Sequence, residues 1–169
     1  MYSFFDVIEN RHSIRAYKDR EVEEEKLLKI LEVVRKAPSA GNLQAYMLYV
    51  VKSKSIKKRL AEAALNQEFI AEAPIVLVFV AVPERSTWRY GSRGEFYALQ
   101  DATIAAAYAQ LAATALELAS VWVGAFDDEE VKDIIDTKDK PIAIMPIGYP
   151  NEEPEITERR KIEEFVIYK

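Results

Sequence analysis

Two short segments near the start of the chain carry residue types suited to binding an anionic, planar ligand. The first, Arg11–Arg15, places two guanidinium groups, an imidazole and a hydroxyl in one short run, and guanidinium groups bind phosphate oxygens through paired N–H donors. The second, Ala37–Gln44, is a turn rich in small polar residues. Its amide side chains can donate to and accept from the edge of a heterocycle. Together the two segments suggest a bound cofactor.

Three motifs, in order along the chain, resemble the FMN-dependent nitroreductase family. They are Arg-His-Ser-Ile-Arg at 11–15, Pro-Ser-Ala-Gly-Asn-Leu-Gln at 38–44 and Trp-Val-Gly-Ala-Phe at 122–126. The resemblance covers essentially the whole chain, so we expect a single FMN-binding domain over residues 1–169. It implies an α+β fold, a three-layer α/β/α sandwich around a mostly antiparallel sheet, and a homodimer with a buried alanine-rich helix.

Composition narrows the chemistry that the chain can supply. Cysteine is absent and His12 is the only histidine, which excludes disulfides, thiolate nucleophiles and imidazole metal cages, so we expect no metal site. The net charge of −5 argues against a nucleic-acid binder. An acidic residue, Asp6, interrupts the N-terminal stretch before any signal-like apolar run forms, so we expect a cytoplasmic protein.

Hydrophobic periodicity and the helix- and strand-breaking residues predict alternating helices and strands. This order supports an α+β or α/β sandwich without fixing strand direction. Ser3 is a predicted N-cap and Pro38 a predicted helix stop. The third helix has a basic side that is interpreted as a solvated face; it carries Lys54, Lys57, Lys58 and Arg59. We expect helices at 3–10, 23–36, 55–65, 97–119 and 127–135, buried strands at 45–51 and 75–82, further strands at 121–125 and 141–148, and an edge strand at 165–168.

The helix predicted over 97–119 is apolar on nearly all sides, so it must be buried in a protein or in a membrane. Polar side chains in this segment argue against the bilayer, where they would lack partners; they are Gln100, Asp101, Gln110 and Glu117. A chain of 19.3 kDa has difficulty burying such a helix completely, so we expect it near a homodimer interface.

The resemblance implies a role for each basic residue. Arg11, His12 and Ser13 match positions that bind the FMN phosphate and ribityl chain, and Arg159 or Arg160 matches a less regular basic position. For the C-terminal residues a solvated tail is an equally good interpretation. Arg15 matches a position facing the pyrimidine edge, where a cation about 4 Å from the charge of the reduced flavin stabilises it by about 4 kcal/mol. A surface ion pair with Asp19 or Glu21 is the alternative for Arg15.

Other positions match the family pattern only through their spacing from the Arg11–Arg15 segment. In the family, the turn carrying Pro38, Ser39, Asn42 and Gln44 contacts the cofactor partly across the dimer interface, and Asn66 and Gln67 resemble an amide contact to the ring. Val123, Gly124 and Ala125 match backbone groups beside the flavin N5 edge. The chain departs from the family at 117–119, where Glu-Leu-Ala replaces a common Gly-Leu-Gly turn. The segment 90–94 is either a lid or a structural loop.

The resulting hypothesis is an oxidoreductase that transfers hydride from NAD(P)H through tightly bound FMN to a nitroaromatic, a quinone or a similar small acceptor. No protein acid or base is required, and no Gly-x-Gly-x-x-Gly fingerprint is present, as expected if the nicotinamide binds in the flavin pocket. Heterocycle oxidation or dehalogenation on the same fold, and flavin binding without turnover, remain alternatives. A serine hydrolase using Ser13 or Ser39 with His12 lacks a Gly-x-Ser-x-Gly elbow.

Overall fold

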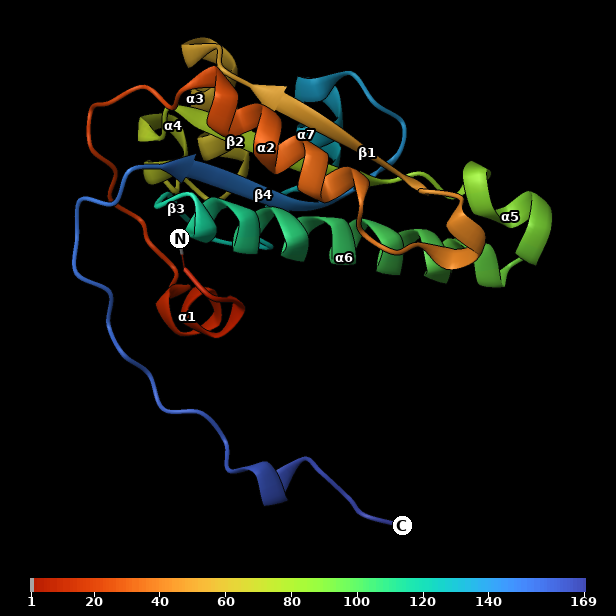
Figure 1. The fold of residues 1–169 in the computed structure, drawn as a ribbon. Helices are drawn as coiled ribbons and strands as arrows, with labels where there is room; N and C mark the ends of the chain where they lie inside the picture. Colours follow the sequence, from red (N-terminus) through yellow and green to blue (C-terminus); the bar gives the residue numbers. More distant parts are fainter. Residues whose placement is uncertain (1) are drawn as a thin grey trace.

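The centre of the protein is an antiparallel sheet whose strands lie in the order β1-β2-β4-β3 (Figure 1). The computed structural model describes residues 2–169, and four strands pair within that range. β2 pairs with β1 on one side and with β4 on the other, and β4 pairs with β3. The strands span Tyr46–Val51 (β1), Ile75–Ala81 (β2), Ala119–Ser120 (β3) and Lys140–Gly148 (β4).

Helices cover both faces of this sheet and give three layers (Figure 1). Leu77 and Phe79 of β2 join the core shared with α2 and α6, whereas Val76 and Val78 join the core shared with α3, α4 and α7, because successive strand side chains point to opposite faces. The predicted α/β/α sandwich with an antiparallel sheet is confirmed. These helices span Glu24–Arg35 (α2), Lys54–Ala63 (α3), Phe69–Glu72 (α4), Arg93–Ala115 (α6) and Asp128–Ile135 (α7).

The remaining elements lie at the two ends of α6 or in the C-terminal tail. α1 packs near the C-terminal end of α6, and α5 packs on its N-terminal part. Ser3 caps α1 through a reciprocal bond pair with Asp6, as the sequence predicted, and Asp127 caps α7 by accepting from the backbone N–H of Glu130. These elements span Phe4–Asn10 (α1), Ala40–Asn42 (η1), Glu84–Tyr90 (α5) and Ile162–Glu164 (η2).

The predicted helix over 97–119 and strand over 121–125 are both displaced in the structure. α6 begins at Arg93 and ends at Ala115, because Glu117 adopts a left-handed backbone conformation with φ of 62°. The chain then enters β3 at Ala119. Beyond β3 only Val123 keeps a bridge to β4, so the strand predicted at 121–125 is wrong.

Burial was misjudged in two places. β1 was predicted as a buried strand but is an edge strand, because β2 pairs with only one of its edges. Two of its side chains, Met47 and Val50, are exposed by 40% and 38%. Lys57 was assigned to a solvated face but is 5% exposed. Its Nζ donates to the carbonyl of Ala73 at the end of α4, and burial lowers the pKa of its ammonium group.

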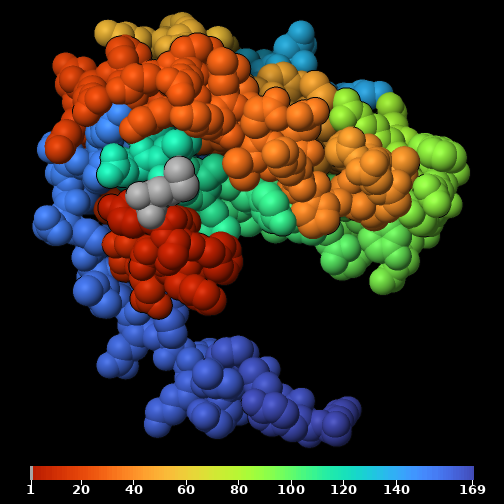
Figure 2. Space-filling view, viewed as in Figure 1, coloured from red at the N-terminus to blue at the C-terminus, as the bar shows by residue number. Residues whose placement is uncertain are grey.

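The C-terminal segment forms an extended arm that projects away from the body of the protein (Figures 1 and 2). No strand forms over 165–168, so the predicted edge strand is wrong for the isolated chain. The apolar side chains of Phe165, Ile167 and Tyr168 are exposed by 66%, 82% and 89%. A strand needs a partner, and within residues 2–169 the arm pairs with no strand of the sheet.

α6 is buried along one side and open along the other. Ala98, Ala105 and Ala109 are fully buried against α2 and the sheet, whereas Phe96 and Leu99 on the opposite side are exposed by 49% and 39%. The prediction of a helix buried on nearly every side therefore holds for only one side in a single chain. Within residues 2–169, no helix is both long and apolar enough to cross a bilayer.

Candidate functional site

The segment from Arg11 to Tyr17 is extended and lies beside β3. Ser13 forms a parallel bridge with Ser120, and the N–H of Ile14 donates to the Ser120 carbonyl at 3.2 Å. Ile14 and Tyr17 point into the core, and the Tyr17 hydroxyl donates to the Ile14 carbonyl at 2.7 Å. Ser13 and Arg15, the two neighbours of buried Ile14, are exposed, as expected where side chains alternate along an extended chain.

A polar cleft of about 420 Å³ opens over these outward side chains. Arg11, Arg15 and Arg159 all line it, so the cations that the sequence assigned to an anionic ligand converge on one site. Arg160 lies outside the lining and forms an exposed ion pair with Glu164 at 3.5 Å. The complete lining is Arg11, His12, Ser13, Arg15, Glu152, Glu153, Pro154, Glu155, Thr157 and Arg159.

Carboxylates of the C-terminal segment also line the cleft. The Glu152 side chain accepts hydrogen bonds from the backbone N–H groups of Arg15 and Ala16 and so fastens the base of the C-terminal arm to the Arg11–Arg15 segment. Burial, and then the negative charge of Glu152, raise the pKa of the Tyr17 phenol, so Tyr17 stays a neutral donor. Sequence reasoning missed Glu152, because nothing in the local pattern links 152 to 15.

The guanidinium of Arg15 is free of carboxylate partners in the structure of residues 2–169. No ion pair joins it to Asp19 or Glu21, which was the alternative interpretation of its charge. Only the backbone N–H of Arg15 is engaged, by Glu152. The side-chain charge is therefore available to a ligand in the cleft.

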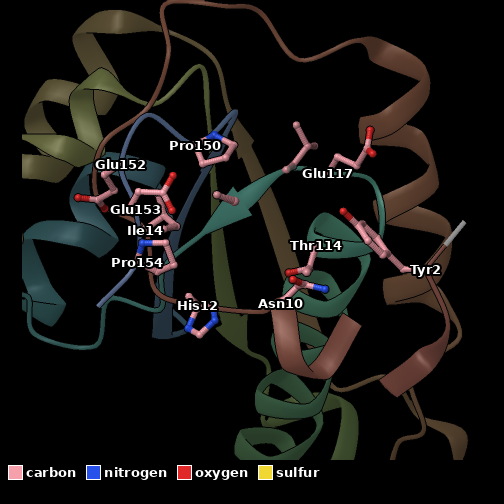
Figure 3. Close-up of a pocket in the computed structure, with 12 residues that line it drawn as sticks. Tyr2, Asn10, His12, Ile14, Thr114, Glu117, Pro150, Glu152, Glu153 and Pro154 are labelled. Carbon is pink, nitrogen blue, oxygen red and sulfur yellow. The ribbon is translucent and has the colours of Figure 1, made fainter. Parts of the chain in front are cut away.

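A second pocket of about 340 Å³ adjoins the cleft and connects it with the end of α6. Figure 3 shows Glu152 and Glu153 on one side of this pocket and Thr114 with Tyr2 on the other, with His12 below. His12 lines both pockets. Glu117 lines the same pocket and has a left-handed φ of 62°, a conformation that glycine adopts more readily than a residue with a Cβ.

The structure places the two loops predicted to face the flavin ring next to each other. The Gln67 amide nitrogen donates to the carbonyls of Ala64, at 2.8 Å, and Ala125, at 3.2 Å. Val123 exchanges two backbone hydrogen bonds with Ile144 at 2.9 and 3.0 Å. Asn66 has a left-handed φ of 59°. The Asn66–Gln67 and Val123–Ala125 segments therefore meet, with the Gln67 donor engaged within the protein.

The turn that carries Ser39, Asn42 and Gln44 lies elsewhere in the chain. Its backbone is held by Asp101, in the first half of α6, whereas Thr114, near the end of α6, lines the pocket that contains His12. Thirteen residues separate 101 from 114, and at 1.5 Å rise per residue this is about 20 Å along the helix axis. A single chain therefore does not bring this turn, or the exposed Pro38 before it, to the cleft.

Asp101 was missed as a site-building residue. Its carboxylate was interpreted only as evidence against a membrane helix, although a carboxylate among alanines was the available signal. Tyr90 of α5 also approaches this turn, with its hydroxyl over Gly41. The segment 90–94 is mostly helical: α5 ends at Tyr90 and α6 starts at Arg93.

Comparison with known proteins identifies the family of this chain. The family model described as "Nitroreductase family" matches residues 8–68 and 61–149. The chain is similar to an NADH dehydrogenase of Thermus thermophilus, with 31% identity over 189 residues, covering 94% of this chain and 92% of the relative. It is also similar to an FMN reductase [NAD(P)H] of Bacillus subtilis, with 31% identity over 158 residues, covering 83% of this chain and 63% of that protein.

Solved structures show the same relationship. An FMN-dependent nitroreductase from Clostridium difficile superimposes with a TM-score of 0.81 and 30% identity, covering 96% of each chain. A nitroreductase family protein from Clostridium novyi gives a TM-score of 0.81 with 31% identity, covering 89% of this chain and 87% of the other. The chain therefore belongs to the nitroreductase family.

Proposed function

We propose that this protein is an NAD(P)H-dependent flavin oxidoreductase that binds FMN in the Arg11–Arg15 cleft and reduces a small planar acceptor, such as a nitroaromatic or a quinone. The observation that carries the proposal is the convergence of Arg11, Arg15 and Arg159 on one cleft, in a chain of the nitroreductase family. Relatives named as an FMN reductase and an FMN-dependent nitroreductase support the choice of cofactor.

The residues of the cleft fit the phosphate end of FMN. A phosphate needs fixed N–H donors and positive charge, and Arg11 with Arg159 supplies both. The Glu152 carboxylate, which lines the same cleft, is partly neutralised by two backbone N–H groups, which limits its repulsion of a phosphate. The hydroxyl of Ser13 adds a neutral donor.

The rest of the site fits an uncharged ring. FMN, when bound, supplies the hydride and electron transfer chemistry, so the chain has only to bind, orient and tune it. Arg15 has a free guanidinium that stabilises negative charge on a reduced ligand. Gly124 bears no side chain, and only the Trp122 indole lies within 4 Å of a Cβ built there, so the backbone at 123–125 allows close approach of a ring.

The site is completed by a second copy of the chain, as part of the same proposal. The open side of α6 carries Phe96 and Leu99, exposed by 49% and 39%, and such apolar surface is stabilised when it is covered. A two-fold axis perpendicular to α6 at this face would run the two α6 helices in opposite directions. The Ser39–Gln44 turn of one copy would then lie next to the cleft of the other.

An absorption spectrum and a steady-state assay test the proposal. Purified protein supplied with FMN should retain the flavin absorbance through gel filtration, elute as a dimer, and oxidise NADH or NADPH when a nitroaromatic or quinone is added. Protein that stays colourless after incubation with FMN would contradict the cofactor assignment. Flavin-loaded protein that is inert toward every acceptor would contradict the reductase activity and favour flavin binding without turnover.

A pair of arginine variants tests which residues form the site. Arg11→Ala should weaken FMN binding by about 30-fold, since a hydrogen bond to a charged group contributes about 2 kcal/mol. Arg35→Ala is the matched control, because Arg35 is an exposed arginine paired with Glu32 on α2. Fluorescence quenching of FMN measures both dissociation constants, and equal values for the two variants would remove Arg11 from the site.

A further inference from the structure

Asp101 is a buried carboxylate whose two oxygens hold the two ends of the Ser39–Gln44 turn. Its side chain lies on the alanine-rich α6, and the residue is only 2% exposed. Oδ1 accepts the backbone N–H of Ala40 at 2.9 Å, and Oδ2 accepts that of Ala45 at 3.2 Å. Within residues 2–169 no lysine or arginine forms an ion pair with Asp101. Burying such a charge is unfavourable unless hydrogen bonds stabilise it. The two bonds to the turn supply that stabilisation, so the carboxylate and the turn depend on each other.

The same turn is held from its other side by a cation. Nη1 of Arg85, on α5, donates to the carbonyls of Gln44 at 3.1 Å and Tyr46 at 2.8 Å. Asp101 therefore binds N–H groups of the segment while Arg85 binds its C=O groups. The two side chains stabilise one backbone conformation by complementary polarity, and each bond includes an ionised partner, which makes it stronger than a neutral one.

The conformation held in this way is an uncommon one. Gly41, Asn42 and Gln44 all have positive φ, at 57°, 57° and 42°. Non-glycine residues persist in this region only where the surrounding structure enforces it. Asn42 is exposed, so the enforced turn presents its amide at the surface rather than to the core of its own chain.

We propose that Asp101 is a positioning residue for the flavin site, acting through the Ser39–Gln44 turn on the cofactor bound in the cleft of the partner copy. The inference rests on the proposed function, because it needs FMN in the cleft and a second copy of the chain. It follows from two distances: Asp101 contacts the turn directly, and the turn lies about 20 Å along α6 from the cleft of its own chain.

The first test replaces the carboxylate by its amide. In Asp101→Asn the side-chain NH₂ faces a backbone N–H, so one of the two bonds is lost and a buried donor is left unpaired. We expect about tenfold weaker FMN binding by fluorescence quenching, in protein whose circular dichroism spectrum shows it to be folded. Asp133→Asn makes the same chemical change at an exposed position on α7 and should bind FMN as the unmodified protein does.

Arg85→Ala provides a second variant if Asp101→Asn fails to fold. Arg85 is exposed, so its removal leaves the core intact while releasing the two carbonyls of the turn. We expect about threefold weaker FMN binding, which is a smaller effect because released carbonyls at the surface can bind water instead.

Mixed dimers distinguish positioning across the interface from a general loss of stability. Coexpression of Asp101→Asn with Arg11→Ala, each with its own affinity tag, gives dimers in which one site combines an intact cleft with an intact turn and the other carries both lesions. About half of the sites should then bind FMN with the affinity of the unmodified protein. The same pairing with Arg85→Ala should give the same result. Recovery of tight sites is a result that a merely structural defect in Asp101→Asn would not produce.

The possible failures are separable. If the unmodified dimer does not bind FMN, the proposed function fails. If it binds FMN but Asp101→Asn and Arg85→Ala bind equally well, the positioning role of Asp101 is wrong. If both variants bind weakly and the mixed dimers recover no tight sites, the turn acts within its own chain, and the action across the interface is wrong.

Discussion

The cleft around Arg11–Arg15 and the turn at Ser39–Gln44 are built in opposite ways. In the cleft, Arg15 and Ser13 are exposed side chains on an extended segment, and their own charge and donors give the site its character. In the turn, the backbone carries the shape, and buried Asp101 enforces it from a helix far along the chain. One half of a binding site can therefore be recognised from its residue types. The other half depends on distant side chains that fix a backbone conformation.

The largest expected effect comes from disturbing the support of the turn without touching the cleft. A Cβ on Gly94 would lie 2.6 Å from the backbone N and Cα of Thr87, where α5 crosses α6. Gly94→Ala should therefore force the two helices apart and lower the free energy of unfolding by about 2–3 kcal/mol, measured by urea denaturation.

Gly124→Ala is the matched control for that substitution. A Cβ at Gly124 meets nothing closer than the Trp122 indole at 3.6 Å, so this variant should be within about 0.5 kcal/mol of the unmodified protein. Equal destabilisation by both variants would show that the α5–α6 contact does not limit stability.

The next effect concerns the cleft and rests on the proposed function. Arg15→Ala removes a cation that favours the reduced, negatively charged flavin, so the reduction potential of bound FMN should fall. A decrease of about 30 mV is expected, equivalent to about 1.4 kcal/mol for two electrons, and redox titration against dye standards measures it. Arg35→Ala should leave the potential unchanged. A potential that does not move in Arg15→Ala would place Arg15 away from the ring.

A smaller gain in stability is expected where the cleft meets the end of α6. Glu117 has a left-handed φ of 62°, which is unfavourable for a residue with a Cβ. Glu117→Gly should raise the free energy of unfolding by about 0.5–1 kcal/mol, measured by thermal denaturation. Glu117→Ala, which keeps the Cβ, should bring no such gain. If both variants have the same melting temperature, the backbone conformation is not the cause.

The smallest expected effect is a pH dependence of stability, at a contact outside both the cleft and the Ser39–Gln44 turn. The Tyr149 hydroxyl donates to Glu23 at 2.6 Å, and this bond, with help from Arg20, lowers the pKa of Glu23 from 4.5 to about 2. A carboxyl whose pKa is lower in the folded state stabilises above pH 4.5, and the contribution is lost as the pH falls toward 2.

Tyr149→Phe therefore should destabilise the protein more at pH 6 than at pH 3, as melting temperatures at the two pH values will show. Tyr108→Phe, at a half-exposed position on α6, is the matched control and should show no pH dependence. Equal loss at both pH values in Tyr149→Phe would mean that the Glu23 contact does not depend on its ionisation.

The fold was predictable wherever the pattern of the chain itself decides the structure. β2 is a continuous apolar run bounded by prolines, α7 starts at the N-cap Asp127, and both were predicted within a residue. The strand expected at 121–125 failed because pairing depends on the distant partner β4, and α6 ended early because Glu117 adopts a conformation that its residue type does not favour. α5 was missed because its short sequence carries no amphipathic period.

The site divides in the same way. The convergence of Arg11, Arg15 and Arg159 followed from their residue types together with a family resemblance. Asp101 and Glu152 could not be found, because each binds backbone groups of a segment that is remote in sequence. Such a contact leaves no local pattern in the sequence. Lys57 was misassigned for the related reason that its one acceptor, the Ala73 carbonyl, belongs to another helix.

The complete burial of β2 on both faces has a consequence for measurements of motion. Its amide hydrogens are shielded by two helical layers and bonded to two strands, so they should exchange with deuterium only when the whole domain unfolds. The amides of the C-terminal arm should exchange at once. The slowly exchanging amides of β2 therefore provide an internal reference. Protection from exchange that a ligand causes around Arg15 and Asn42 can be compared with it directly.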